Sequence, residues 1–231
     1  WLYPIYPFKT QEEQQQFIDD FHPANLLSRH PKARPLMTAS ELASLQSMVQ
    51  RYIQAMKISP DIIVQEGVMC AWMKQNADDT KSEDPKGVEM VPAIAYCNYL
   101  DGKIINVKFR SVQQHPITGE WSKLFCQVSP TKPCAPYGID SINLLRPDAQ
   151  PIRQLIITEG EKDRLTLMTG GFPCGLSIAN GASTNIEESH EAFDEWIQQA
   201  GEIIICGDTD RPGRRLVKLL IEQYQTRAKV T

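Results

Sequence analysis

Two stretches decide the fold class: QLIITEGE (residues 154–161) and EIIICGDTD (residues 202–210). Each is a run of apolar, largely β-branched residues that ends in a glycine and carboxylates. Runs of this kind are typical of strands that are covered on both faces, as in a parallel sheet. Helical patterns separate them, so the chain from residue 151 onward is predicted to be an α/β unit with a parallel sheet.

The predicted strands and helices of this unit alternate along the chain. Strands are expected at Gln154–Thr158, Phe172–Ala179 and Glu202–Cys206, and helices at Glu161–Met168, Glu187–Gln199 and Arg211–Tyr224. The last residues, Ala228–Thr231, are expected to begin a fourth strand.

Carboxylates follow the first and third predicted strands at equivalent places, Glu159 in one case and Asp208 with Asp210 in the other. In an open α/β sheet, functional sites gather beyond the carboxyl ends of the strands, so we expect these side chains to share one crevice. Three crowded anions call for a cation, and carboxylate oxygens are the ligands that Mg²⁺ prefers. We therefore interpret all three as catalytic or metal-binding residues, with Mg²⁺ or Mn²⁺ as the cofactor. For Glu161 and Asp163, a role in a helix cap or a solvated loop is an equal alternative.

The first part of the chain has a different pattern. Helices are predicted over residues 38–58, from about Ser59-Pro60, and at Gln11–Phe21, and strands over Pro92–Leu100, Gly102–Ser111 and Trp121–Val128. Asp101-Gly102 is a strong hairpin signal, so these strands are expected to form an antiparallel sheet. The whole chain is therefore predicted to be α/β, with an arm or linker at 1–36, an α+β lobe at 37–150 and the parallel-sheet lobe at 151–231.

Basic residues concentrate on the predicted antiparallel strands. Residues 101–132 carry five Lys or Arg against two acidic residues, although the protein has a net charge of −4. Spacing alone is equally compatible with phosphate binding and with an ordinary solvent-facing sheet. Helix positions add two weaker candidates, which charge balance or ordinary exposure would also explain. The candidate nucleic-acid or nucleotide-binding residues are Lys103, Lys108, Arg110, Lys123, Lys162 and Arg214.

Bulk composition is that of an ordinary soluble globular protein, with 42% hydrophobic and 23% charged residues. No apolar run reaches the roughly 18–20 residues that a membrane span needs. Six cysteines without a Cys-x-x-Cys pair indicate a reducing, cytoplasmic compartment rather than a disulfide or zinc framework. We expect Cys70, Cys97 and Cys206 to be small hydrophobic residues in apolar surroundings.

The two acidic stretches resemble those of toprim domains, which occur in primases, topoisomerases and some nucleases. The similar segments are Ile157-Thr158-Glu159-Gly160-Glu161-Lys162-Asp163 and Gly207-Asp208-Thr209-Asp210. The pattern Asp-x-Asp-x-x-Gly-Arg from Asp208 to Arg214 resembles the primase part of phage primase–helicases and of the mitochondrial replicative helicase family. The same is true of Ala179–Ser183, Asn98–Lys103 with Val107–Arg110, Phe125-x-Gln127 and Pro136-Tyr137-Gly138.

This resemblance implies a toprim, Rossmann-like lobe within a DNA primase catalytic core that makes short RNA primers. It implies Glu159 as a catalytic carboxylate and Asp208 and Asp210 as metal ligands, and it favours Lys108 and Arg110 as binding residues. The partners that it implies are a single-stranded DNA template, nucleoside triphosphates and a replicative helicase. The resemblance is to replication proteins of bacterial or phage type.

Three alternatives stay open. A toprim-type nuclease would use the same carboxylates to hydrolyse phosphodiesters. A non-catalytic lobe of a replicative helicase would bind single-stranded DNA without making primers. A regulatory α/β module would bind phosphate without a metal.

Overall fold

The computed structural model describes residues 39–74, 90–127, 135–145, 151–178, 193–194, 196–226 and 229–230. The chain divides into two compact units. The first contains Trp1–Cys97 and Lys103–Ser129, and the second contains Asn98–Gly102 and Pro130–Thr231. The predicted arm at 1–36 and its helix at Gln11–Phe21 lie outside the described residues. The domain boundaries drawn from the sequence stay a prediction.

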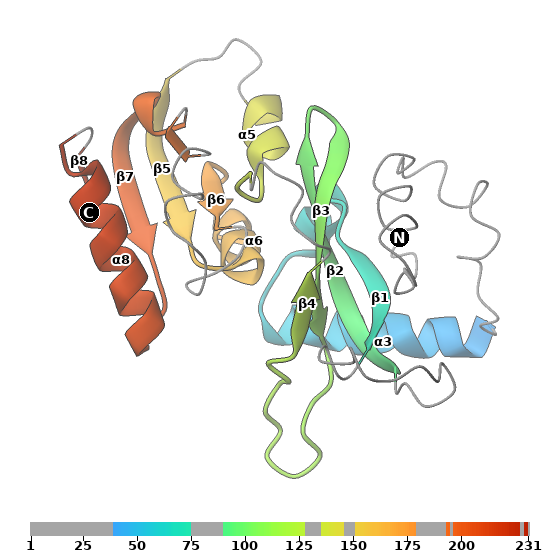
Figure 1. Cartoon of the computed structure of the whole chain (residues 1–231). Helices are drawn as coiled ribbons and strands as arrows, with labels where there is room; N and C mark the ends of the chain where they lie inside the picture. The colour runs from blue at the N-terminus through green and yellow to red at the C-terminus, as the bar shows by residue number, and fades with distance from the viewer. Residues whose placement is uncertain are drawn as a thin grey trace, which may run out of the picture. The chain divides into compact units, whose positions relative to one another are not determined.

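The first unit is built on a four-stranded antiparallel sheet in the order β1-β2-β3-β4 (Figure 1). Its strands are β1 (Met69–Lys74), β2 (Met90–Leu100), β3 (Lys103–Ser111) and β4 (Phe125–Gln127). Two helices precede the sheet, α3 (Ala39–Ala55) and α4 (Pro60–Gln65). Helix α3 buries Leu45, Val49, Tyr52 and Ile53, which recur at the spacing of one helical face. No helix in the described part of the chain is long and apolar enough to cross a bilayer.

Most predicted elements of this unit are confirmed, including α3, the helix beginning at Ser59-Pro60, and strands β2 and β3. The strand predicted at Trp121–Val128 is wrong over its first residues. Trp121 forms only an isolated bridge with Gln114, because residues 112–122 fold into a separate turn. Strand β1 was not predicted.

The tip of the β2–β3 hairpin is the two-residue turn Asp101-Gly102, in which both residues have positive φ angles of 53° and 73°. This is the backbone that an Asp-Gly hairpin turn requires. The carboxylate of Asp140, in the first turn of α5 (Ile139–Leu145), accepts hydrogen bonds from the Asp101 N–H at 2.9 Å and the Gly102 N–H at 2.6 Å. Asn98 Nδ2 also donates to the Ala135 carbonyl at 2.9 Å. The hairpin turn is thus stabilised both by its own Asp-Gly sequence and by hydrogen bonds to Asp140 and Ala135, which belong to the same unit.

Asp140→Ala is expected to destabilise the protein by about 1–2 kcal/mol, because it removes a charged acceptor shared by two backbone N–H groups. The loss should appear first as faster amide hydrogen exchange at Asp101 and Gly102, measured by NMR. Asp140→Asn, which keeps one carbonyl oxygen, should show a smaller change. Unchanged exchange at both amides in Asp140→Ala would contradict the expected role.

The second unit is built on a four-stranded parallel sheet in the order β6-β5-β7-β8 (Figure 1). Its strands are β5 (Ile152–Thr158), β6 (Gly175–Ser177), β7 (Ala200–Cys206) and β8 (Lys229–Val230). Helix α6 (Glu161–Thr169) follows β5, and α8 (Arg211–Tyr224) follows β7. The predicted parallel α/β pattern is confirmed, although β6 is shorter than expected and α5 was not predicted. Of the predicted helix Glu187–Gln199, only residues 193–194 and 196–199 are described.

A buried arginine connects α6, β6 and the segment around Tyr137 in this unit. Arg164 of α6 is fully buried, its Nε donates to the Gly175 carbonyl at 2.6 Å, and its guanidinium lies 5.1 Å from the Tyr137 ring centroid. Tyr137 exchanges two backbone hydrogen bonds with Ser177, which joins its segment to β6. Gly138 has a φ of +103°, and a Cβ there would lie 2.1 Å from Arg164 Nε. Tyr137 therefore packs against the buried Arg164 guanidinium, and Gly138 leaves room for it.

Candidate functional site: an acidic cluster at the sheet's carboxyl edge

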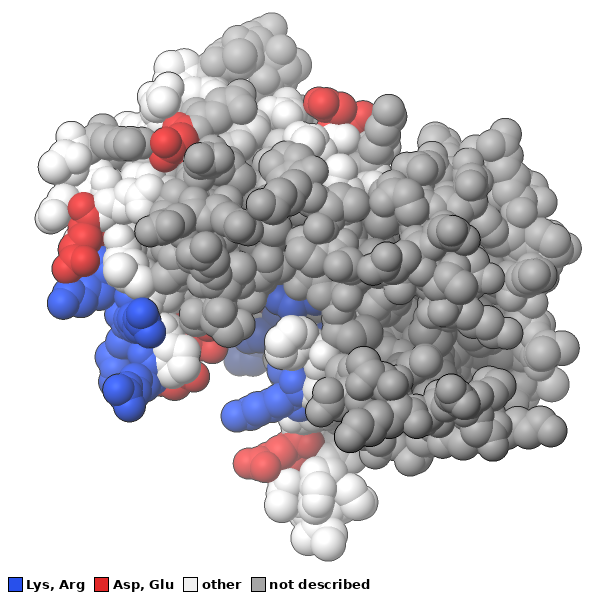
Figure 2. All heavy atoms as spheres, in the orientation of Figure 1, with Lys and Arg blue, Asp and Glu red and all other residues white. Residues whose placement is uncertain are grey.

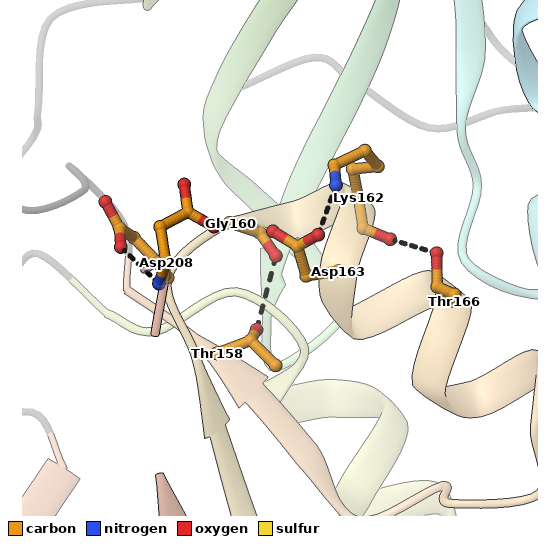
Figure 3. A network of polar contacts seen from close by, with 7 residues as sticks. Thr158, Gly160, Lys162, Asp163, Thr166 and Asp208 are labelled. Carbon is orange, nitrogen blue, oxygen red and sulfur yellow. Dashed lines mark hydrogen bonds and ion pairs between the residues drawn. The ribbon is translucent and has the colours of Figure 1, made fainter. Parts of the chain in front are cut away.

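Glu159 and Asp208 lie at the carboxyl ends of two neighbouring strands. Strands β5 and β7 are paired in parallel with Thr158 opposite Cys206, so the loops that follow them start side by side. Glu159 Oε2 accepts a hydrogen bond from the backbone N–H of Asp208 at 3.1 Å (Figure 3). Two stretches that are 49 residues apart in the chain therefore meet at one point, as the sequence predicted.

The carboxylates at this edge are close enough to change one another's chemistry. Partial burial raises the pKa of Glu159 above its ordinary value, and the negative charges of Asp208, Asp210 and Asp163 raise it further. The hydrogen bond from the Asp208 N–H opposes this shift without cancelling it. We call Glu159, Asp163, Asp208 and Asp210 the acidic cluster.

Asp210 also has a structural role as the N-cap of α8. Its Oδ1 accepts a hydrogen bond from the Gly213 N–H at 2.8 Å. A Cβ at Gly213 would lie 2.4 Å from the Asp208 carbonyl oxygen, and one at Gly207 would lie 2.5 Å from Val217 Cγ2. Glycines at both places thus let the start of α8 pack directly against the Asp208 backbone.

Asp163 was not singled out as a metal ligand from the sequence, yet it belongs to the cluster. It lies in the first turn of α6 and forms an ion pair with Lys162. Partial burial raises the pKa of the Cys206 thiol and the charge of Asp163 raises it further; because Asp163 also raises the pKa of Glu159, it lies near the ends of both β5 and β7. In Figure 3, Asp163 and Asp208 lie on either side of Gly160. Its position four residues after Glu159, at the start of a helix, was the signal that could have identified it.

The donors of the cluster fit a hard divalent cation in their chemistry. They are carboxylate oxygens, their mutual repulsion is visible at Glu159, and Asp208 and Asp210 are exposed. Within the described residues, no three His, Cys, Asp or Glu side chains are already gathered in the arrangement of a metal site. A cation would therefore have to draw these side chains together, and metal binding stays a prediction.

The pH dependence of stability should report the raised pKa of Glu159, which comes first from its partial burial and then from the charges of Asp208, Asp210 and Asp163. Its folded-state pKa is above the ordinary value of 4.5, so above that pH the folded chain holds this proton more tightly than the unfolded chain does. The contribution of Glu159 to stability must therefore fall as the pH rises from the ordinary pKa of 4.5 through the raised pKa of the folded state. Without divalent cations, Glu159→Gln should match the wild type in melting temperature near about pH 4 and exceed it near about pH 7.

Millimolar Mg²⁺ at neutral pH should raise the melting temperature of the wild type more than that of Glu159→Gln, because the variant lacks one of the four carboxylates whose repulsion the cation offsets. The measurement is thermal unfolding followed by circular dichroism, with EDTA or Mg²⁺. A difference in melting temperature between the two proteins that is the same at every pH would contradict the expected pH dependence. An equal effect of Mg²⁺ on both would contradict the expected role of the cation.

The predicted basic residues lie in both units. Lys162 is half-buried and paired with Asp163, and exposed Arg214 lines a hollow that also includes Asp208 and Lys218. Figure 2 shows Lys and Arg side chains gathered over α8. In the first unit, Lys108 and Arg110 are half-buried on β3, and Lys123 is exposed. The side chain of Lys103 lies outside the described residues. The binding roles of these six residues stay predictions.

The cysteine expectations are confirmed in two of three cases. Cys70 and Cys97 are buried, and burial raises the pKa of both thiols to about 12. The prediction of apolar surroundings for Cys206 is wrong, because this residue is exposed at the end of β7.

The second unit contains a fold of toprim type, in which carboxylates follow two adjacent parallel strands. In agreement, residues 154–231 match the family model described as the Toprim domain. Parts of the chain beyond this domain are also similar to primase proteins. It is 27% identical over 140 residues to the primase homolog protein of Arabidopsis thaliana, a match that covers 55% of this chain and 36% of that protein.

Two further relatives point in the same direction. The Twinkle homolog protein, chloroplastic/mitochondrial, of Arabidopsis thaliana is 24% identical over 191 residues, which are 77% of this chain and 22% of that protein. The crystal structure of the primase fragment of the bacteriophage T7 primase-helicase protein has the same fold, with a TM-score of 0.53 and 22% identity. That match covers 77% of this chain and 62% of the other.

The chain spans about a third and about a fifth of the length of the two curated relatives. What is shown is therefore a primase-like toprim fold.

Proposed function

We propose that the chain is the catalytic core of a DNA primase, which makes short RNA primers on a single-stranded DNA template. The observation that carries this proposal is the 3.1 Å hydrogen bond between Glu159 and the Asp208 backbone, which brings the two acidic loops to one edge of the sheet. Primer synthesis joins a 3′-hydroxyl to the α-phosphorus of a nucleoside triphosphate and releases pyrophosphate. The site must therefore accept a proton and offset the charge of phosphates.

The acidic cluster supplies the first of these requirements. A carboxylate with a raised pKa is a stronger base than an ordinary one, so Glu159 is suited to take the proton of the attacking hydroxyl. Asp208, Asp210 and Asp163 would hold Mg²⁺ or Mn²⁺ with it, and such an ion, when bound, supplies positive charge for the phosphates. The hydrogen bond from the Asp208 N–H orients the Glu159 carboxylate for its role.

The basic residues supply charge for the polyanionic substrates. In this proposal, Lys103, Lys108, Arg110 and Lys123 bind the phosphates of the template or the incoming nucleotide. Arg214 would contact a phosphate from the start of α8, close to Asp208 along the same hollow. Lys162 is the weakest of the six because Asp163 already neutralises it.

A replicative helicase is the proposed partner. One similar structure is a fragment of a primase-helicase protein, and one curated relative is a Twinkle homolog. In this proposal the template reaches the site as the single strand that a helicase exposes. The cytoplasmic location predicted from the sequence belongs to the same proposal and stays a prediction.

The test is primer synthesis from labelled nucleoside triphosphates on single-stranded DNA, with Mg²⁺, Mn²⁺ or EDTA. The proposal expects short products that require template, nucleotides and a divalent cation. Cutting of DNA without nucleotides would favour the nuclease, and metal-independent DNA binding without products would favour the non-catalytic lobe. The relatives extend well beyond the matched region, so a form of the chain extended by such flanking regions should be assayed beside it.

A further inference from the structure

One face of the β3–β4 pair combines cations with an exposed aromatic ring. In the antiparallel register Arg110 lies opposite Phe125, and Lys108 lies two residues before Arg110 on β3. Residues that are paired across strands, and residues two apart within a strand, point to the same side of a sheet. Lys108, Arg110 and Phe125 therefore share one face. Phe109 points to the other side, where only 4% of its surface is exposed.

Phe125 differs from Phe109 in that 52% of its surface is exposed. The ammonium of Lys108 lies 5.6 Å from the centroid of the Phe125 ring, within the range of a cation–π contact. A ring that is held beside a cation on a sheet presents a flat apolar surface next to positive charge. The ring is thus available to a flat ligand that carries negative charge close to it.

The surrounding charge favours an anionic ligand. Between residues 104 and 127, the basic side chains are Lys108, Arg110 and Lys123, and the acidic one is Glu120. Figure 2 shows Lys and Arg side chains over this part of the sheet, with an acidic one nearby. Arg110 is half-buried on the same strand as Lys108, so its positive charge lies close to the Phe125 ring.

We infer that Phe125 is a base-stacking residue for single-stranded nucleic acid, with Lys108 and Arg110 binding the adjacent phosphates. Single strands bind to surfaces where aromatic rings carry the bases and cations follow the backbone, and stacking works for every base because each has a flat face. This inference rests on the proposed primase function in one respect only, namely that the strand is the template.

The test compares Phe125→Leu with Phe172→Leu in the whole chain. Phe172 is an equally exposed phenylalanine, at 51%, and it lies in the second unit after α6. Binding of a labelled single-stranded oligonucleotide is measured by fluorescence anisotropy, together with binding of an oligonucleotide of the same length that lacks bases. Circular dichroism checks that each variant is folded.

Phe125→Leu is expected to weaken binding of the normal oligonucleotide roughly 5- to 100-fold, and to leave binding of the baseless one unchanged. Phe172→Leu should bind both as the wild type does. The slope of log affinity against log salt should be unaltered in Phe125→Leu, whereas Lys108→Gln and Arg110→Gln should each reduce it by about 0.7.

A second readout covers the case in which Phe125→Leu does not fold. In Phe125→Trp, the added indole fluorescence should be quenched by the normal oligonucleotide and not by the baseless one. Equal affinity of Phe125→Leu and the wild type for the normal oligonucleotide, or absence of quenching in Phe125→Trp, would overturn the inference.

The outcomes also separate this inference from the proposed function. Primer synthesis by the wild type without any effect of Phe125→Leu on base-dependent binding would remove the stacking role alone. Base-dependent binding that is lost in Phe125→Leu, in a chain that makes no primers, would support the stacking role and count against the primase.

Discussion

Glu159→Gln is expected to reduce primer synthesis by roughly 10²- to 10⁴-fold, the range that loss of a general base produces. The amide cannot take a proton from the attacking hydroxyl, and it is a poorer ligand for a divalent cation than a carboxylate. Its oxygen can still accept the hydrogen bond that Asp208 N–H donates to Glu159 Oε2. The variant should therefore fold normally, so that the loss reports chemistry. The measurement is the initial rate of labelled nucleotide incorporation on single-stranded DNA.

The matched control is Glu202→Gln, the same chemical change on β7. Glu202 forms an ion pair with Lys229 at 2.6 Å and accepts a hydrogen bond from Gln154. It belongs to the opposite end of the strand from Asp208, so its loss should leave the rate of primer synthesis unchanged. If Glu159→Gln kept more than about half of the wild-type rate, Glu159 would not be the base.

Gly138→Ala is expected to destabilise the protein by about 3–5 kcal/mol, an effect at the upper end for a single substitution. The added Cβ would lie within 2.6 Å of three atoms of the Arg164 guanidinium, and the φ of +103° disfavours any side chain. Arg164 cannot move aside without losing its hydrogen bond to Gly175 while it remains buried. The change should be measured as a loss of free energy of unfolding in urea.

Gly171→Ala separates the two causes of this effect. Gly171 also has a positive φ, of +89°, but a Cβ there would meet nothing within 4 Å. Its substitution should cost only the backbone strain, about 1–2 kcal/mol. If the two variants were equally destabilised, the contact with Arg164 would be no part of the cause.

The parallel sheet was predictable because its strands are marked by uninterrupted apolar runs. Leu155-Ile156-Ile157 and Ile203-Ile204-Ile205 are short, largely β-branched apolar runs of the kind that favours a buried strand, and a glycine shortly after each one marks where it stops. Since parallel strands end at the same edge, the meeting of Glu159 with Asp208 followed from the same pattern. For these two strands, the structure predicted from the local sequence pattern is the one that the folded chain has.

Strand β1 escaped prediction because it lacks the alternation by which strands are identified. Met69, Cys70, Ala71 and Met73 are all buried, so polar residues do not mark an outer face. Strand β4 begins later than predicted, at Phe125. Residues 112–122 form a turn in which backbone hydrogen bonds join His115 to Glu120 and Gln113 to Ser122, and this turn keeps Trp121 out of the strand.

The closeness of Glu159 and Asp208 was predictable from the sequence, and the finer structure around them was not. The spacing of Asp208 and Asp210 identifies both as acidic neighbours, but only the geometry shows that Asp210 caps α8 through Gly213. The place of Asp163 in the first turn of a helix after Glu159 was visible in the sequence, but its closeness to the end of β7 emerges only from the structure. The same holds for Gly138, whose partner Arg164 is 26 positions away in the printed sequence.

The interleaving of the two compact units limits how the protein can be dissected. The chain passes from one unit to the other after Cys97, after Gly102 and after Ser129. A fragment beginning at residue 130 would lack Asp101 and Gly102, whose backbone N–H groups donate to the Asp140 carboxylate. In that fragment, water would have to replace both hydrogen bonds. The second unit therefore cannot be exchanged as one continuous segment of the chain. A chimera that replaces residues 130–231 must also replace residues 98–102.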